Sequence, residues 1–153
     1  MASIGQSMSA VPYRGRRVRL SGYVRVDSVT GGGAGLWMRI DGATATLGFD
    51  NMISYGRPIT GTTGWLLYTV VLDVPVDAVG VTIGALFDGR GLVRIDDVKF
   101  EIVDTTISDA ATRAAWHTIS CVRFHLLVGS PERGECECEW RIFWCGATHG
   151  RCD

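Results

Sequence analysis

The chain has 153 residues and a formal net charge of -1 at pH 7. This length suffices for one domain with a proper core, while the near-neutral charge lacks the basic footprint of a nucleic-acid-binding domain. The first 15 residues contain neither a charged leader nor the apolar core of a signal peptide, and no stretch approaches the roughly 18 apolar residues of a membrane span. We therefore expect a cytoplasmic protein that contacts neither nucleic acid nor a membrane.

The first predicted strand covers residues 17–26, where apolar and polar residues alternate. Arg17, Arg19 and Arg25 would share its polar face, because side chains two apart point to the same side of a strand. The basic residues form no run dense enough for a polyanion. We therefore interpret this face as a solvated sheet surface and not as a track for phosphates.

Further strands are predicted along the chain up to Val103. The same alternation recurs at residues 36–41, 45–50 and 81–88, whereas residues 65–74 are apolar on both faces and favour a central strand. Glycine-rich segments such as "TGGGAG" (Thr30–Gly35) and "DGRG" (Asp88–Gly91) are interpreted as flexible turns between strands. Short strands, such turns and the lack of a helical pattern predict an all-β, antiparallel sandwich or jelly roll.

A candidate ligand-binding face lies on the polar side of these strands. An aromatic ring can pack on the C–H surface of a sugar, while Arg, Asp and Asn hydrogen-bond its hydroxyls. The alternative is structural: Trp37 would pack under a loop, and Arg39 would pair with Asp41 or Asp50. The residues of the predicted face are Tyr23, Trp37, Arg39, Asp50 and Asn51.

The last predicted strand, "LVRIDDVKFEIV" (Leu92–Val103), changes its apolar phase at Asp96 and Asp97. A strand has a side-chain period of two, so an inserted residue is needed to keep one face buried. We therefore predict a β-bulge at the two acids. It would allow five apolar side chains to reach the core: Val93, Ile95, Val98, Phe100 and Ile102.

Several of these segments together resemble a known bacterial domain. The most specific are "YRGRRVRLSGYV", "AGLWMRIDG" and "FDNM". The domain occurs alone or behind the helix-turn-helix part of some AraC-type regulators, and it is similar in pattern to the galactose-binding-like jelly roll of carbohydrate-binding modules. The resemblance covers about Gly5 to Val103. It implies a two-sheet antiparallel sandwich without catalytic machinery of its own.

The resemblance also carries two structural implications. In such jelly rolls an Asp on the last strand often helps to hold a structural calcium, and Asp96 or Asp97 matches that position. It also implies strands N-terminal to those of this chain, whose absence would remove the other calcium ligands and leave a sheet edge open. Such an edge could support a homo-oligomer.

The composition changes after Val103, which predicts a β-sandwich domain at residues 1–103 and an atypical tail at 104–153. All five Cys and all three His lie in this tail. A helix could begin at Ser108 or Asp109 and run towards Val128. We favour a tail unrelated to the domain, such as a frameshifted end, over a disulfide framework or a zinc site. The zinc alternative would use Cys136, Cys138, Cys145, His149 and Cys152.

Function follows from what the first 103 residues contain and lack. They include neither Cys nor His, so a Ser-His or Cys-His nucleophile cannot be built from them. An enzyme with paired Asp residues is the least favoured hypothesis. We expect a non-catalytic binding module for a carbohydrate or similar small polar ligand. The alternative is an accessory sensor or protein-interaction domain of a bacterial transcription regulator.

Overall fold

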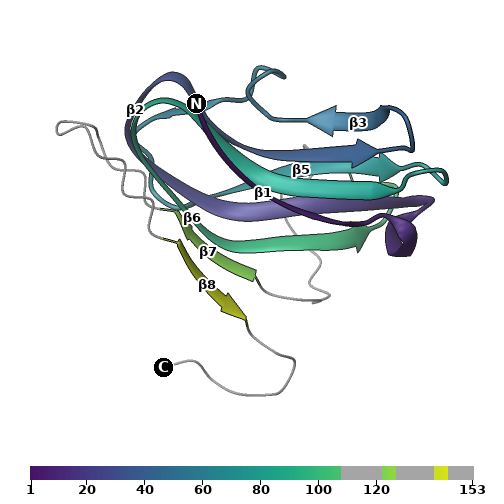
Figure 1. Ribbon diagram of the computed structural model, residues 1–153. Helices are drawn as coiled ribbons and strands as arrows, with labels where there is room; N and C mark the ends of the chain where they lie inside the picture. The colour runs from purple at the N-terminus through teal and green to yellow at the C-terminus, as the bar shows by residue number, and fades with distance from the viewer. Residues whose placement is uncertain (108–121, 127–139, 145–153) are drawn as a thin grey trace.

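The computed structural model describes residues 1–107, 122–126 and 140–144, and this part of the chain is all-β and antiparallel (Figure 1). It contains one 3-10 turn, η1 (Val11–Tyr13), and no α-helix. No helix in the described ranges is long and apolar enough to cross a membrane. The strands are β1 (Ala2–Ser9), β2 (Arg16–Asp41), β3 (Thr46–Asp50), β4 (Ile59–Gly61), β5 (Leu66–Val74), β6 (Gly80–Val103), β7 (Val122–Leu126) and β8 (Trp140–Trp144).

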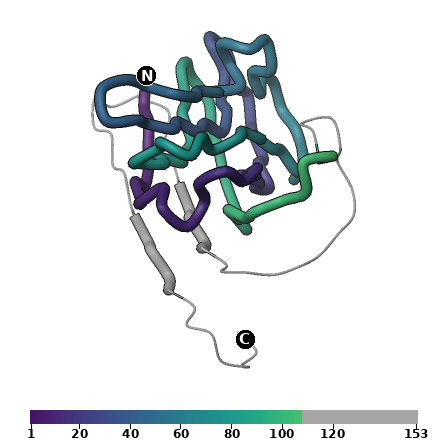
Figure 2. The backbone as a smooth tube through the Cα atoms, turned by 90° about the vertical axis from the view of Figure 1, so that its right-hand side faces the viewer, coloured from purple at the N-terminus to yellow at the C-terminus, as the bar shows by residue number. Residues whose placement is uncertain are grey.

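Two long strands, β2 and β6, organise the whole fold. They pair antiparallel from Arg17 opposite Val103 to Asp41 opposite Gly80. Both strands bend back together at their middle, so the curled sheet forms two layers from the same pair of strands (Figures 1 and 2). In one layer, the half of β2 after the bend lies between β3 and β6, and β6 pairs with β1 on its other side. In the other layer, the half of β2 before the bend lies between β5 and β6, and β6 pairs with β7.

The bend depends on glycines in two segments, residues 30–35 and 88–91, that the sequence predicted to be turns between strands. Gly31 of β2 pairs with Gly89 of β6, and their φ angles of 91° and 143° disfavour any side chain. A Cβ atom on Gly89 would lie 1.8 Å from the carbonyl oxygen of Thr30. The two predicted turns are therefore bends within continuous strands. The chain does not reverse at these glycines, which let the backbones of β2 and β6 approach closely.

The core lies between the two layers and draws on both halves of the long strands. Val24 and Val26 meet Leu36 and Met38 in one buried cluster. Arg57 joins the layers at one side: its guanidinium binds the Asp50 carboxylate of β3 and donates to the Thr69 carbonyl of β5 at 3.3 Å. This contact also covers part of the outer edge of β5.

The position of β5 differs from the expectation of a central strand. In the described part of the chain it pairs with β2 alone, so it is an edge strand. Its apolar start remains on the surface, with Trp65, Leu66 and Leu67 exposed by 43%, 49% and 37%. Hydrophobicity on both faces identified a strand correctly, but it could not show how many neighbours the strand has.

The predicted bulge at Asp96 and Asp97 is confirmed. Tyr23 pairs with Asp96 and Ser21 pairs with Lys99, so β6 contains one more residue than β2 in this interval. Asp97 has a φ angle of 49°, which is unusual for a residue with a side chain. Four of the five apolar side chains reach the core as predicted, whereas Ile102 is 48% exposed.

The N-terminal residues form β1, a strand that the sequence patterns did not predict. It pairs with β6 from Ala2 opposite Phe87 to Ser9 opposite Gly80, and Ile4 and Met8 pack against the core. In the described ranges its second edge has no partner strand. Strand β1 is thus an edge strand in the described part of the chain, while the expectation that strands are missing before it stays a prediction.

Two described segments fall within the predicted tail. Val122 of β7 pairs with Val98 of β6, and β7 pairs with β8. Strand β7 lies where the sequence suggested the end of a helix. The rest of that helix and all five candidate zinc ligands lie outside the described residues.

Candidate functional site

Trp37 and Arg39 lie on the outer face of the layer that contains β1 and β3. The Trp37 indole crosses two neighbouring strands, because Gly84 of β6 and Gly5 of β1 leave room for it. Cβ atoms on these glycines would lie 2.6 Å from Trp37 Nε1 and 2.8 Å from its Cζ2. The indole N–H is buried and has no hydrogen-bond partner in the described part of the chain. Trp37 is thus half-buried, and its ring lies against glycines of its own sheet.

Arg39 is the exposed polar group nearest to this ring along β2. It pairs in register with Phe49 of β3, which is 40% exposed, and its Nε donates to Asp41 Oδ2 at 3.0 Å. The structural alternative, an ion pair with Asp41, is therefore observed. The guanidinium has donors left for a ligand, because one contact uses only its Nε.

Asp50 does not belong to this face. Its side chain is 8% exposed, accepts a hydrogen bond from the Met52 amide at 2.8 Å and binds Arg57. The sequence assignment for β3 had the wrong phase: Leu47 and Phe49 are exposed, while Asp50 points inward beside the core residue Met38. The buried ion pair with Arg57 explains why an acid tolerates this position.

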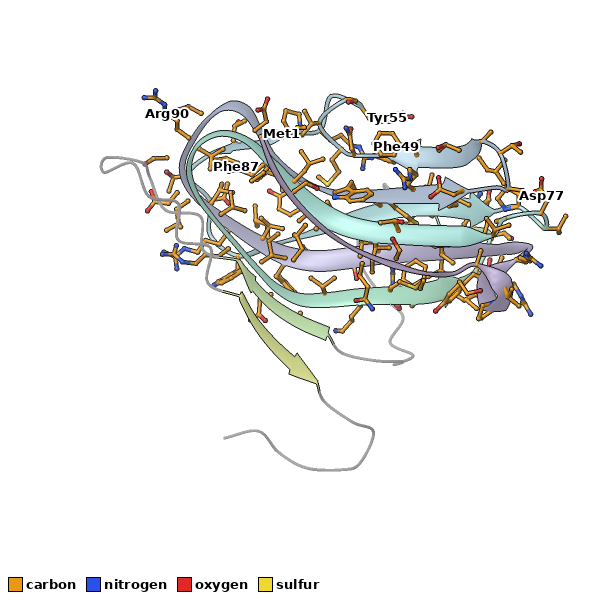
Figure 3. All side chains as sticks on the ribbon, in the orientation of Figure 1. Met1, Phe49, Tyr55, Asp77, Phe87 and Arg90 are labelled. Atoms are coloured by element: carbon orange, nitrogen blue, oxygen red, sulfur yellow. The ribbon has the colours of Figure 1, made fainter. Side chains whose placement is uncertain are left out.

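Asn51 has a local structural role. Its Oδ1 accepts the Ser54 amide at 2.8 Å, and its Nδ2 donates to the Ser54 hydroxyl at 2.9 Å. In the same turn, the hydroxyl of Tyr55 donates to the Phe49 carbonyl at 2.9 Å. Phe49 and Tyr55 lie next to each other (Figure 3). They are exposed aromatics that the candidate list missed.

Tyr23 lies on the other layer. It pairs with Leu67 of β5 and Asp96 of β6, on the near half of β2, whereas Trp37 lies beyond the bend. The structure therefore does not bring the five predicted ligand-binding residues together. It leaves Trp37 and Arg39 on one surface and Tyr23 on another.

The two bulge acids, which are the predicted calcium ligands, make local contacts in the structure. Asp97 Oδ2 binds Lys99 Nζ at 2.8 Å, and Asp96 Oδ1 accepts the Asp97 amide at 2.8 Å. No cluster of three metal-ligating side chains occurs in the described ranges. Calcium takes six to eight oxygen ligands, so these two acids would need further ligands to hold it, and the calcium site stays a prediction.

The arginine face of β2 divides into paired and unpaired members. Arg17 forms a two-pronged contact with Asp73 at 2.7 Å, and this hydrogen bonding lowers the pKa of the Asp73 carboxyl below its usual value. Arg19 binds Glu101 at 2.8 Å. Arg25 instead faces Arg94 of β6 directly in register. The sequence could not reveal that pair, because it depends on the register between distant strands.

Comparison with known proteins gives one informative relative. No family model matches the chain. A protein of Bacillus subtilis (strain 168), described as the uncharacterized HTH-type transcriptional regulator YbfP, is 43% identical over 107 residues. The chain resembles part of a bacterial transcription regulator.

The extent of this match limits what it shows. It covers 69% of this chain and 35% of YbfP, so the chain spans about a third of the length of that relative. The regulator part of the expected resemblance is thereby supported. The match says nothing of a galactose-binding-like family or of a carbohydrate ligand.

Proposed function

We propose that this β-sandwich is an accessory domain of an HTH-type bacterial transcription regulator, or a stand-alone relative of such a domain. The supporting observation is the 43% identity with YbfP, together with the all-β structure of the described residues. A helix-turn-helix reads DNA with a recognition helix, and the described ranges contain no α-helix. The shared part is then a region that accompanies the DNA-binding motif, and it acts beside DNA in the cytoplasm.

An exchange experiment tests this role. The matched segment of YbfP is replaced by the corresponding residues of this chain, and the chromosomal sites occupied by the chimera are mapped by chromatin immunoprecipitation. We expect the same sites as for YbfP, because the DNA-binding helices are untouched. A folded chimera that loses all these sites would contradict the proposal. Strong DNA binding by the isolated 153-residue chain would contradict it as well.

A second candidate is the binding of a neutral sugar on the surface formed by Trp37, Arg39 and Phe49. Its support is the register pairing of exposed Phe49 with Arg39, two residues along β2 from Trp37. Titration of the full chain with a panel of neutral sugars tests it. Arg39→Gln and Phe49→Ala should both weaken a genuine response, whereas Tyr23→Phe on the other layer should not.

A further inference from the structure

The most unusual charge arrangement in the described residues is the pair Arg25 and Arg94. The two residues are direct neighbours across β2 and β6, and like charges in that position are destabilising. Arg25 is exposed and Arg94 is half-buried. Neither has a hydrogen bond or an ion pair with any residue in the described ranges.

The other arginines of residues 1–107 show that this lack of partners is not general. Five of them bind a carboxylate or a carbonyl: Arg14, Arg17, Arg19, Arg39 and Arg57. Arg16 and Arg90 also lack a partner in the described residues, but they lie opposite Val74 and Thr30. Within residues 1–107, Arg25 and Arg94 are the one place where two arginines without a partner lie opposite each other in register.

The surroundings of the pair indicate a small ligand. Tyr23 lies in the next row of the same face, with Leu67 in register beside it, so a phenol ring and an apolar contact border the arginines. Asp27 and Asp96 flank the pair along the two strands, and each already accepts a local hydrogen bond, from the Ser28 hydroxyl and the Asp97 amide. Further negative charges of a polyanion or an anionic membrane would meet these carboxylates.

We infer that Arg25 and Arg94 form a binding site for the phosphate group of a small phosphomonoester. A guanidinium group offers a planar fork of donors that matches phosphate oxygens, and two forks balance the charge of a dianion. Tyr23 contacts the remainder of the ligand through its ring or hydroxyl. The site itself does not depend on the proposed function. Only the role of the ligand does, because in a transcription regulator it would be the effector.

Calorimetric titration of the full chain tests the site with inorganic phosphate, glucose 6-phosphate and glucose at matched ionic strength. We expect saturable binding of inorganic phosphate and of glucose 6-phosphate, and no binding of glucose. Arg25→Gln and Arg94→Gln should each weaken binding about tenfold or more, since a hydrogen bond to a charged group contributes about 1.5–3 kcal/mol. Arg90→Gln is the matched control and should leave the affinity unchanged.

Stability provides a separate control for folding. Arg94→Gln removes like-charge repulsion, so the melting temperature without ligand should stay the same or rise. Phosphate should raise the melting temperature of the wild type and of Arg90→Gln more than that of the two site variants.

The inference is wrong if no phosphorylated probe binds saturably, or if all three variants bind equally. Preferential binding of DNA would overturn it too. The exchange experiment with YbfP is independent of these titrations, so failure of the phosphate site and failure of the accessory-domain role can be told apart.

Discussion

At the scale of single residues, glycines determine where side chains can lie. The Trp37 indole packs directly on the backbone of Gly84 and Gly5. Because glycine has no side chain, the sequence gives no sign of this contact. The sequence identified Trp37 as exposed on the polar face, which is partly right. It could not predict the half-burial, because that depends on glycines contributed by β1 and β6.

Gly84→Ala should therefore destabilise the protein. The added Cβ would lie 2.0 Å from the Ile4 carbonyl oxygen and 2.6 Å from Trp37 Nε1, and the first of these atoms belongs to the backbone. Overpacking of this kind costs about 1–3 kcal/mol. Urea denaturation measures the free energy of unfolding, and the tryptophan fluorescence, to which Trp37 contributes, should change as well.

Gly64→Ala is the matched control, because nothing lies within 4 Å of a Cβ atom at that position. Its effect should stay within about 0.5 kcal/mol. If both substitutions had the same small effect, the close packing of the indole on Gly84 would be contradicted.

At the scale of elements, phase and register decide what the sequence can and cannot reveal. The bulge on β6 could be predicted, because the break in alternation is local to Asp96 and Asp97. The predicted phase of β3 was wrong. Its apolar residues Leu47 and Phe49 are exposed, and its inward position is taken by Asp50, which forms an ion pair with Arg57. The Arg25–Arg94 pair was beyond reach, because its partners come from strands that are far apart in the chain.

The conformation of the bulge leads to a comparison of two substitutions at Asp97. The φ angle of 49° is tolerated by Asn but not by a β-branched residue. Asp97→Val should have a free energy of unfolding about 1–2 kcal/mol lower than Asp97→Asn, as measured by urea denaturation. Both variants lose the ion pair with Lys99, so that loss cancels. Equal stability of the two variants would argue against the left-handed bulge.

At the scale of the whole molecule, the two layers end in edges of different character. Arg57 covers part of the edge of β5, whereas β1 has an unpaired edge in the described residues and contains no charge and no proline. Such an edge is a template for pairing with another strand. The sequence-based hypothesis of a homo-oligomer through an open edge therefore remains a prediction, now assigned to β1.

Light scattering of the full chain over a range of concentrations measures this association. We expect the mass to rise above that of a monomer, and Gln6→Lys to suppress the rise, because an edge lysine opposes strand pairing. Gln6 is exposed, so the substitution should not disturb the core. Thr44→Lys, in the exposed turn before β3, is the control of equal charge. A monomer at every concentration, or equal suppression by both variants, would refute the role of β1.

The bend shared by β2 and β6 also has a kinetic consequence. Each layer needs the same two strands at its centre, and their pairing joins Arg17 to Val103 across most of the described chain. Neither layer is complete until β6 has added its half of the ladder, and the last pairs to form join residues that are far apart in the chain. High contact order of this kind is associated with slow folding. A chain emerging from the ribosome can pair β2 with β3 and β5 early, but it completes the β2–β6 ladder only after Val103 has been synthesised.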